Sequence, residues 1–437
     1  MTLFGKELGR VFRAPVYWLA VAALALFLFS QEVLPFSADH DLLAEPQPGQ
    51  ASYGTQAVED PVRIMPAAVR SLLEEYQSNL YTAYPIGFYR QVRLPEDRQA
   101  QMAALLSQLT GVPADALPTV DADGGGPLEA GADLQSDGSG GYVVVQPERR
   151  PPATDNGVQP REDLTYEAFL ALLRQADALI GGGSKYGEAY LVSNFGQTPL
   201  TYEQALERYR AVQEQDRFTG AYARLFSDYA GVFLSLLPVF VSTALWLQDR
   251  RAKAGPLLYV RRVSSGRLVA ARYAAQTVAL LLAALLLALC ATAPTWGFYP
   301  GQPSAPLAFL AYGLGWLLPS ILVAAAVGMF WTVLTDTPVA LLLQGLWWFW
   351  DINRGVGDFD GGYGLWQLIP RHNTLGQAQL FWDHLGQLAA NRLLLTGLAA
   401  LLVLATVAVY EQKRRGALHG NTRGKRLLAA RKGRPAA

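Results

Sequence analysis

Residues 229–293 hold the stretch that decides the fold. It reads YAGVFLSLLPVFVSTALWL at 229–247 and QDRRAKAGPLLYVRRVSSGRLVAAR at 248–272, and an uncharged run rich in Leu and Ala follows at 273–293. An uncharged helix of 19 residues reaches about 28 Å, roughly the hydrocarbon thickness of a bilayer. We therefore expect transmembrane helices at 228–247 and 273–293, joined by a charged segment at 248–272.

Composition indicates that a soluble part accompanies these spans. Hydrophobic residues make up 51% of the 437-residue chain and charged residues only 16%, whereas soluble domains carry about 25% charged residues. The mean hydropathy of +0.14 is nevertheless too low for a chain that lies in the membrane along its whole length.

Charge divides the chain in the same way. Residues 32–227 hold 27 acidic and 14 basic residues, a balance of −13, whereas the remainder carries +13. An asymmetry of this size indicates that two parts of the chain lie in different surroundings. It also excludes nucleic acid as a partner of the acidic part, because phosphate binding needs a basic face. The single cysteine, Cys290, allows neither an internal disulfide nor a cysteine-based zinc site.

Four more apolar segments complete the expected membrane part, at 14–36, 306–333, 338–350 and 389–410. The segment at 338–350 reaches only about 20 Å as a helix, so it must extend further or cross incompletely. Before the first span, residues 1–13 place apolar and basic side chains on opposite faces, which favours a helix lying on the membrane surface; a polar lead-in is the alternative. The expected fold class is an α-helical polytopic membrane protein with six transmembrane helices and a mainly α extracytoplasmic domain between the first two.

Basic residues in short loops predict the topology, because they mark the cytoplasmic side. Lys and Arg number three in the N-terminal segment, seven in 248–272 and nine in the tail at 411–437, against none in 294–305 and two in 351–388. Six spans with both termini in the cytoplasm satisfy every count. The acidic domain at 37–227 and the segment at 351–388 then lie outside.

The acidic domain reads as helical. Amphipathic stretches occupy 62–80, 95–110, 163–180 and 201–217, and Thr201 with Gln204 fits a capping box. A flexible insert rich in Gly, Asp and Pro is expected at 117–161, with one strand near 142–146 as part of a minor hairpin.

No catalytic, cofactor-binding or metal-ligating set is expected. The run IGGGSKYG at 180–187 lacks the spacing and the preceding strand of a phosphate loop. Of the four histidines, His40, His372, His384 and His419, the pair His372 and His384 shares the outer segment with Asp383 and is read as interfacial or solvated rather than as a metal site. The spans contain no Asp or Glu away from their ends, so an ion-coupled carrier is disfavoured. The neutral polar residues Ser235, Ser242, Thr243 and Gln344 are candidates for a translocation path, and hydrogen bonding between helices is the alternative.

The segment at 248–272 is the most specific feature. Its apolar centre, residues 257–260, lies between Gly255-Pro256 and Arg261-Arg262, and Ser264 or Ser265 is placed to cap the following helix. Such a segment lies on lipid headgroups or docks into the groove of a partner.

With these features together, the sequence resembles the ABC-2 type permeases, the membrane subunits of ATP-binding-cassette exporters. The resemblance rests on the basic N-terminal helix, the large domain after the first span, PLLYVRRVSSGRLVAARY at 256–273 and GLWQLIPRHNTLG at 364–376, where the family has re-entrant helices. YPIGFYRQVRL at 84–94 and GGGSKYGEAYLVSNFGQTPLTYEQAL at 181–206 are similar to outer domains of Gram-positive-type members. Many members carry a Glu near the start of the charged segment, whereas residues 251–255 here read RAKAG.

The resemblance implies an exporter subunit of the bacterial plasma membrane that is not itself an enzyme. A dimer of ATPase subunits would bind ATP and Mg²⁺, and a second permease subunit, identical or related, would complete the transmembrane core. The coupling residues it implies are Pro256, Leu257, Leu258, Tyr259, Val260, Arg261, Arg262, Ser264 and Ser265. The alternative is a membrane-anchored sensor or scaffold whose outer domain binds a ligand or an envelope partner. The substrate is not readable from the sequence.

Overall fold

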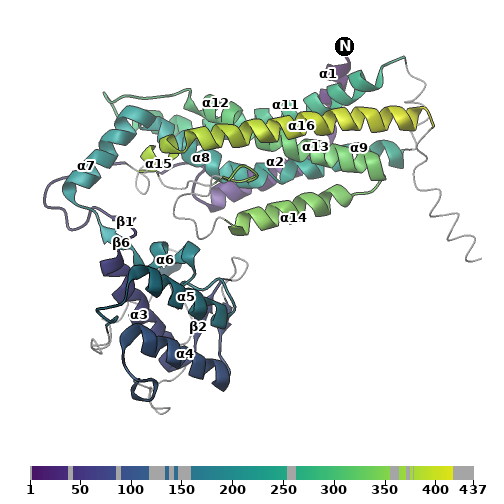
Figure 1. The fold of residues 1–437 in the computed structure, drawn as a ribbon. Coiled ribbons are helices and arrows are strands. Elements are labelled where there is room, and N and C mark those ends of the chain that lie inside the picture. The colour runs from purple at the N-terminus through teal and green to yellow at the C-terminus, as the bar shows by residue number, and fades with distance from the viewer. Residues whose placement is uncertain are drawn as a thin grey trace, which may run out of the picture. The chain divides into compact units, whose positions relative to one another are not determined.

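The computed structural model describes residues 2–37, 43–84, 90–117, 133–136, 142–145, 159–252, 262–354, 364–370, 375–376 and 378–416. The described chain is mostly helical and divides into two compact units (Figure 1). We call the residues up to Tyr53 and from Thr201 onward the helical body, and those from Gly54 to Leu200 the inserted unit.

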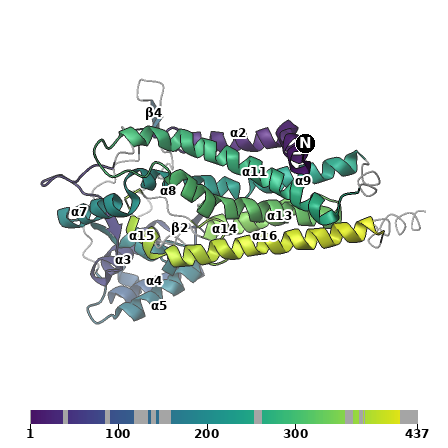
Figure 2. The same ribbon diagram turned by 90° about the horizontal axis from the view of Figure 1, so that it is seen from above.

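The helical body is built from long helices that run side by side (Figure 2). Helix α13 packs between α9 and α16, and α1 lies against α11. A π-helical turn at Val212–Asp216 follows α7, and another at Gly313–Leu317 joins α12 to α13. The helices are α1 (Leu3–Arg13), α2 (Pro15–Ser30), α7 (Tyr202–Ala211), α8 (Thr219–Leu234), α9 (Leu237–Arg251), α11 (Ser265–Thr292), α12 (Ala308–Tyr312), α13 (Leu318–Thr335), α14 (Val339–Arg354), α15 (Ala378–Asp383) and α16 (Leu385–Arg414).

Several of these helices are long and apolar enough to cross a membrane. Three qualify alone, Ser265–Gly297, Ala308–Thr335 and Leu385–Arg414. Two bent pairs raise the number to five, α1 with α2 at 64° and α8 with α9 at 40°. Helix α14 is apolar over Val339–Ile352 but shorter than the others. The helical character of the expected fold is therefore confirmed, and three to five segments among the described residues are long and apolar enough to span a membrane.

Helix boundaries differ from the expected spans where local chemistry decides them. The helix expected at 273–293 begins at Ser265, because the Ser264 hydroxyl accepts a hydrogen bond of 3.3 Å from the Arg267 amide and caps it. The span expected at 228–247 is two helices rather than one. The break lies just before Pro238, which has no amide hydrogen to continue a helix. The first span, expected to 36, ends as a helix at Ser30.

The inserted unit is a small helical domain with its own core. Helices α3 (Pro61–Ser78), α4 (Glu96–Thr110), α5 (Tyr166–Ile180) and α6 (Glu188–Phe195) bury apolar side chains against one another. Three antiparallel strand pairs join β1 (Thr55–Ala57) to β6 (Gln197–Pro199), β2 (Tyr81–Ala83) to β3 (Arg90–Val92), and β4 (Asp133–Ser136) to β5 (Tyr142–Val145). The predicted helices and the minor hairpin are confirmed, whereas α6 and the short pairs at 55–57 and 81–92 were not predicted.

The inserted unit covers fewer residues than the domain expected at 37–227. Residues 202–227 form α7, the π-helical turn and the start of α8, and Tyr222 and Phe226 are buried in the core of the helical body. Of the expected insert at 117–161, the described residues are Leu117, the β4–β5 pair and 159–161.

Candidate functional site

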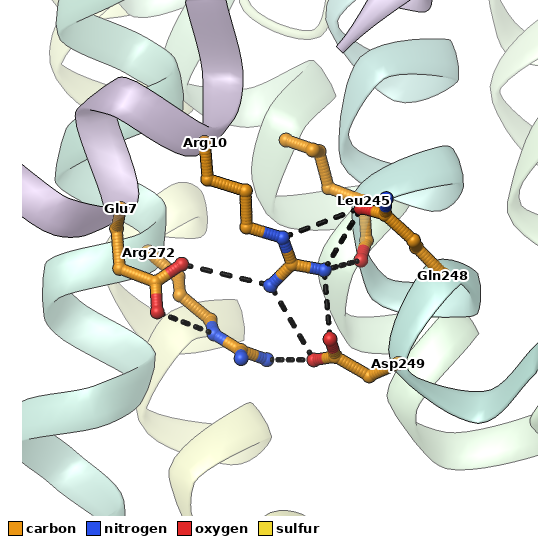
Figure 3. A network of polar contacts seen from close by, with 6 residues as sticks. All are labelled: Glu7, Arg10, Leu245, Gln248, Asp249 and Arg272. Atoms are coloured by element: carbon orange, nitrogen blue, oxygen red, sulfur yellow. Dashed lines mark hydrogen bonds and ion pairs between the residues drawn. The ribbon is translucent and has the colours of Figure 1, made fainter. Parts of the chain in front are cut away.

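Four charged side chains meet where α1, α9 and α11 come together (Figure 3). Glu7 and Arg10 come from α1, Asp249 from the end of α9 and Arg272 from the start of α11. Arg272 pairs with Asp249 at 2.6 Å and with Glu7 at 3.4 Å, and Arg10 pairs with Asp249 at 2.8 Å and with Glu7 at 3.6 Å. Each acid therefore lies between two cations, and we call this set the charge ring.

Arg10 also holds the last turn of α9. Its Nη2 donates to the Leu245 carbonyl at 2.7 Å and to Gln248 Oε1 at 3.2 Å. Leu245 and Gln248 lie in the last two turns of α9, so both bonds attach α1 to the C-terminal end of that helix. The N-terminal helix is thus fixed to the residues from which the 253–261 segment departs.

The charge ring is partly shielded from solvent. The Arg272 side chain is 8% exposed and that of Arg10 24%. The Arg272 guanidinium lies 4.8 Å from the centroid of the Trp246 ring, a cation–π contact. The two acids and two arginines of the charge ring balance in charge, and partial burial weakens the screening of these charges by salt. Removal of one member would therefore leave a neighbouring charge uncompensated.

Further polar contacts tie the other helices at the same end of the helical body, where α9 ends, α11 begins and α16 ends (Figure 1). The Ser265 hydroxyl donates to Glu411 of α16, and Arg414 Nη1 donates to the Val263 carbonyl at 2.8 Å. Lys413 pairs with Asp336, just after α13, at 2.8 Å. Both flanks of the 253–261 segment are therefore anchored in the helical body.

Most of the predicted coupling residues, Pro256, Leu257, Leu258, Tyr259, Val260 and Arg261, lie outside the described residues. Of the others, Arg262 is exposed, Ser264 caps α11 and Ser265 is buried against α16. Ser264, rather than Ser265, is thus the cap.

The candidate path residues Ser235, Ser242, Thr243 and Gln344 are all buried. Ser242 donates to the Ala325 carbonyl of α13 at 3.0 Å and accepts from Gln276 of α11 at 3.2 Å. Gln344 of α14 donates to the Ser235 carbonyl at 2.7 Å, and Thr243 accepts from Thr332 at 3.3 Å. These bonds match the alternative of hydrogen bonding between helices, and a role in a path stays a prediction.

The glycine run at 180–187 ends a helix. Gly181 takes a φ of +113° as the C-cap of α5, a conformation that favours glycine. The Lys185 ammonium pairs with Glu75 at 2.9 Å. His384, the one histidine within the described residues, has its Nδ1 2.8 Å from the Leu380 carbonyl.

Buried charges in the helical body were not predicted. Arg224 and Asp216 form a buried pair at 2.7 Å, and Arg392 is buried near the start of α16. Arg392 lies inside the expected span at 389–410, and its charge within an apolar run was the available signal.

A scan against protein-family models and searches of curated proteins and of solved structures find no match to this chain. The likeness to ABC-2 type permeases therefore rests on the residues and motifs of the sequence alone.

Proposed function

We propose that this chain is the permease subunit of an ABC-2 type exporter, driven by ATP that a separate ATPase subunit hydrolyses. The observation that carries the proposal is the charge ring. It joins the N-terminal helix to both flanks of the segment that the sequence predicts to dock the ATPase.

The ring suits a transmission element. A docked ATPase would push or pull on residues 253–262, and the displacement would reach α9 through Asp249 and α11 through Arg272. Because Arg10 and Glu7 bind these two residues, α1 would move with them. A polar network with balanced charges holds its members in one arrangement, which a transmission element requires.

The proposal includes six spans with both termini in the cytoplasm of a bacterial cell and the inserted unit outside. The candidate spans supply up to five, and α14 would be the sixth. The end of the helical body that carries the ring also carries Arg262, Lys413 and Arg414, as the positive-inside rule requires of a cytoplasmic face.

A second permease subunit is also part of the proposal. Helices α14 and α16 carry large apolar side chains that are exposed in the single chain, namely Leu342, Leu346, Trp350, Leu393, Leu401 and Leu404. Surfaces of this kind are covered by lipid or by another membrane helix.

The test is purification of the whole chain from its native membranes in mild detergent, with mass spectrometry of what accompanies it. A variant carrying Leu257→Asp, Leu258→Asp and Tyr259→Asp should insert and fold but lose the ATPase. A matched variant, Leu427→Asp with Leu428→Asp in the basic tail, should keep it. Retention of the ATPase by the first variant would show that the segment does not dock it.

A sensor or scaffold is the second candidate, and the inserted unit favours it. That unit buries a core of its own, as a ligand-binding module would. This function predicts a folded chain that repeatedly purifies without any ATPase. Loss of signalling, rather than of transport, would then follow removal of the inserted unit.

A further inference from the structure

A cavity of about 470 Å³ lies in the helical body, bounded by α12 and the π-helical turn after it, by α15, by the start of α16 and by the turn before α8. Binding sites for small molecules have volumes of about 300–1,000 Å³ and largely apolar walls. The wall of this cavity combines aromatic side chains with small residues. The aromatic residues are Tyr312, Trp316, Phe381 and Trp382, and the small ones include Gly315 and Ala389.

Contacts among the aromatic residues hold this wall in place. The ring centroid of Phe381 lies 5.8 Å from that of Tyr312 and 5.6 Å from that of Trp316. The Trp382 ring lies 5.4 Å from Phe381, and its nitrogen donates to Asp216 at 3.1 Å. Ring pairs at these distances attract each other beyond the burial of their apolar area. The wall is therefore formed before any ligand binds, which lowers the cost of binding.

The buried charges of the wall, Asp216 and Arg392, are engaged within the chain. Asp216 accepts a hydrogen bond of 2.7 Å from Arg224. Arg392 Nη1 donates to Ser320 Oγ at 2.8 Å and to the Trp316 carbonyl at 3.1 Å, and its guanidinium lies 5.5 Å from the centroid of the Trp316 ring. Nε and Nη2 of Arg392 are buried as well, so they are closed to a ligand. These two side chains support the wall and offer no charge to the cavity.

Little net charge is left to select a charged ligand. Asp228 and Asp351, which lie outside the wall, counter the charge of Arg392. Arg217 is in the wall but exposed, as is Gln215, so both lie where the cavity meets solvent. An ion pair between exposed groups changes an affinity by about fivefold or less. Apolar contact, rather than charge, therefore determines what the cavity binds.

The cavity also borders apolar surface. Trp382 and Leu385, both in its wall, are 38% and 42% exposed. Leu385 begins α16, which is long and apolar enough to cross a membrane. In the membrane that the proposed function assigns to α16, alkyl chains are the apolar matter in contact with such a surface.

We propose that this cavity binds an uncharged alkyl chain, supplied by a membrane lipid or by a free amphiphile such as a fatty ester. The chain packs against the aromatic residues and displaces water, which finds few polar partners there. The polar end of the molecule lies at the mouth, near Gln215 and Arg217. The inference rests on the membrane location in the proposed function and not on transport or on an ATPase, because the whole site lies within one chain.

The test is photolabelling of the full chain, transferred from detergent into amphipol, by a stearate methyl ester with a diazirine in mid-chain. Mass spectrometry then locates the label. We expect label within residues 308–317 and 378–392 that excess methyl stearate suppresses. The corresponding free acid should label these residues within about fivefold of the ester, because Arg217 is exposed. Labelling by a phosphatidylcholine with the same diazirine chain identifies a lipid as the source, and labelling by the ester alone identifies a free amphiphile.

Two pairs of variants separate the cavity from the surrounding apolar surface. Ala389→Trp fills the cavity and should lose the suppressible label, whereas Ala390→Trp adds the same side chain one position along α16, outside the wall, and should keep it. Gly315→Phe and Gly397→Phe form the second pair, since a Cβ at either glycine meets nothing within 4 Å and only Gly315 lines the cavity.

The second pair decides the matter if Ala389→Trp does not fold. Label that methyl stearate does not suppress, or that survives in the cavity-filling variants, would overturn the proposal. An acid that labels far more than fivefold better than the ester would overturn the uncharged character of the ligand.

Discussion

Arg272 is the most buried member of the charge ring. It faces Asp249, Glu7 and the Trp246 ring at once. Its replacement would leave two carboxylates close together with only Arg10 between them. The residue thus holds α1 and α9 to the start of α11.

We predict that Arg272→Gln loosens the N-terminal helix. The loss of a charged hydrogen-bond partner costs about 1–3 kcal/mol, which corresponds to roughly five- to 150-fold more frequent local opening. Hydrogen exchange by mass spectrometry of the full chain should show faster exchange over residues 3–13. Arg267→Gln is the matched control, since Arg267 is exposed on the same helix. Unchanged exchange in the Arg272 variant would mean that the ring does not hold α1.

At the residue scale, short-range chemistry was predictable and long-range pairing was not. Thr201 and Gln204 form the expected capping box, and Ser264 caps α11, because each cap involves only three or four consecutive residues. Glu7 and Arg272 are 265 positions apart, so only the packing of α1 against α11 brings them together. Asp249 lies at the start of the charged segment at 248–272, but nothing local in the sequence indicates its two arginine partners.

Helices α9 and α13 approach each other closely at Gly328. A Cβ at this position would lie 2.8 Å from Ser242 Cβ and 3.1 Å from the Val239 carbonyl oxygen. The Ser242 hydrogen bond to Ala325 depends on the same approach. The absence of a side chain therefore permits the packing that links these two helices.

We predict that Gly328→Ala destabilises the helical body by about 1–3 kcal/mol, because α9 and α13 must separate. Thermal unfolding in detergent, followed by tryptophan fluorescence, measures the change. Gly397→Ala on α16 is the control, since a Cβ there meets nothing within 4 Å. A variant at Gly328 as stable as the control would refute the close packing.

The inserted unit has a buried phenol that makes its stability depend on pH. Tyr186 donates a hydrogen bond of 2.7 Å to Glu75, which also pairs with Lys185. Burial, and secondarily the charge of Glu75, raises the pKa of Tyr186 well above its usual value of 10.0. Burial also raises the pKa of Tyr81. The folded unit therefore keeps protons that the unfolded chain releases.

The stabilisation is fully present below pH 10 and is lost as the pH rises above that value. Each such tyrosine contributes a slope of about 1.4 kcal/mol per pH unit. Pulse proteolysis of the full chain between pH 9 and pH 11 should show increasing cleavage within residues 159–200. Tyr186→Phe removes one of these titrating groups, so it should reduce the slope by about 1.4 kcal/mol per pH unit. A slope that the substitution leaves unchanged would contradict the assignment.

At the element scale, the sequence predicted which segments are helical but not where each helix begins and ends. Apolar runs identify α11, α13 and α16, since their length and hydropathy are local properties. The sequence places the start of α8, up to residue 227, in the acidic domain, yet Arg224 is buried in the helical body. Helix α6 was not predicted because its eight residues follow a glycine-rich stretch, which is typical of a loop.

In the whole molecule, the ends of the inserted unit lie beside each other. The Leu200 amide donates to the Gly54 carbonyl at 3.0 Å, and β1 pairs with β6 immediately inside these residues. An insertion with adjacent ends can be removed without stretching the remaining chain. The helical body should therefore fold without residues 54–200.

We predict that replacing residues 54–200 by a short Gly-Ser linker leaves the unfolding temperature of the helical body within about 4 °C, the shift expected for 1 kcal/mol or less. All ten tryptophans lie outside the deleted segment, so their fluorescence reports the helical body alone. The proposed function further predicts that the shortened chain still purifies with an ATPase subunit. Aggregation of the shortened chain, with the full chain stable, would mean that the two units fold as one.

The measurement that tests the central claim most directly is the composition of the complex that this chain forms in its own membrane. The full chain, purified in mild detergent, is examined by native mass spectrometry. The proposed function predicts two permease subunits bound to two ATPase subunits, and loss of the ATPase alone when Leu257, Leu258 and Tyr259 are changed to Asp. A folded chain that is recovered repeatedly without any ATPase would contradict the proposal and leave the sensor or scaffold as the better description.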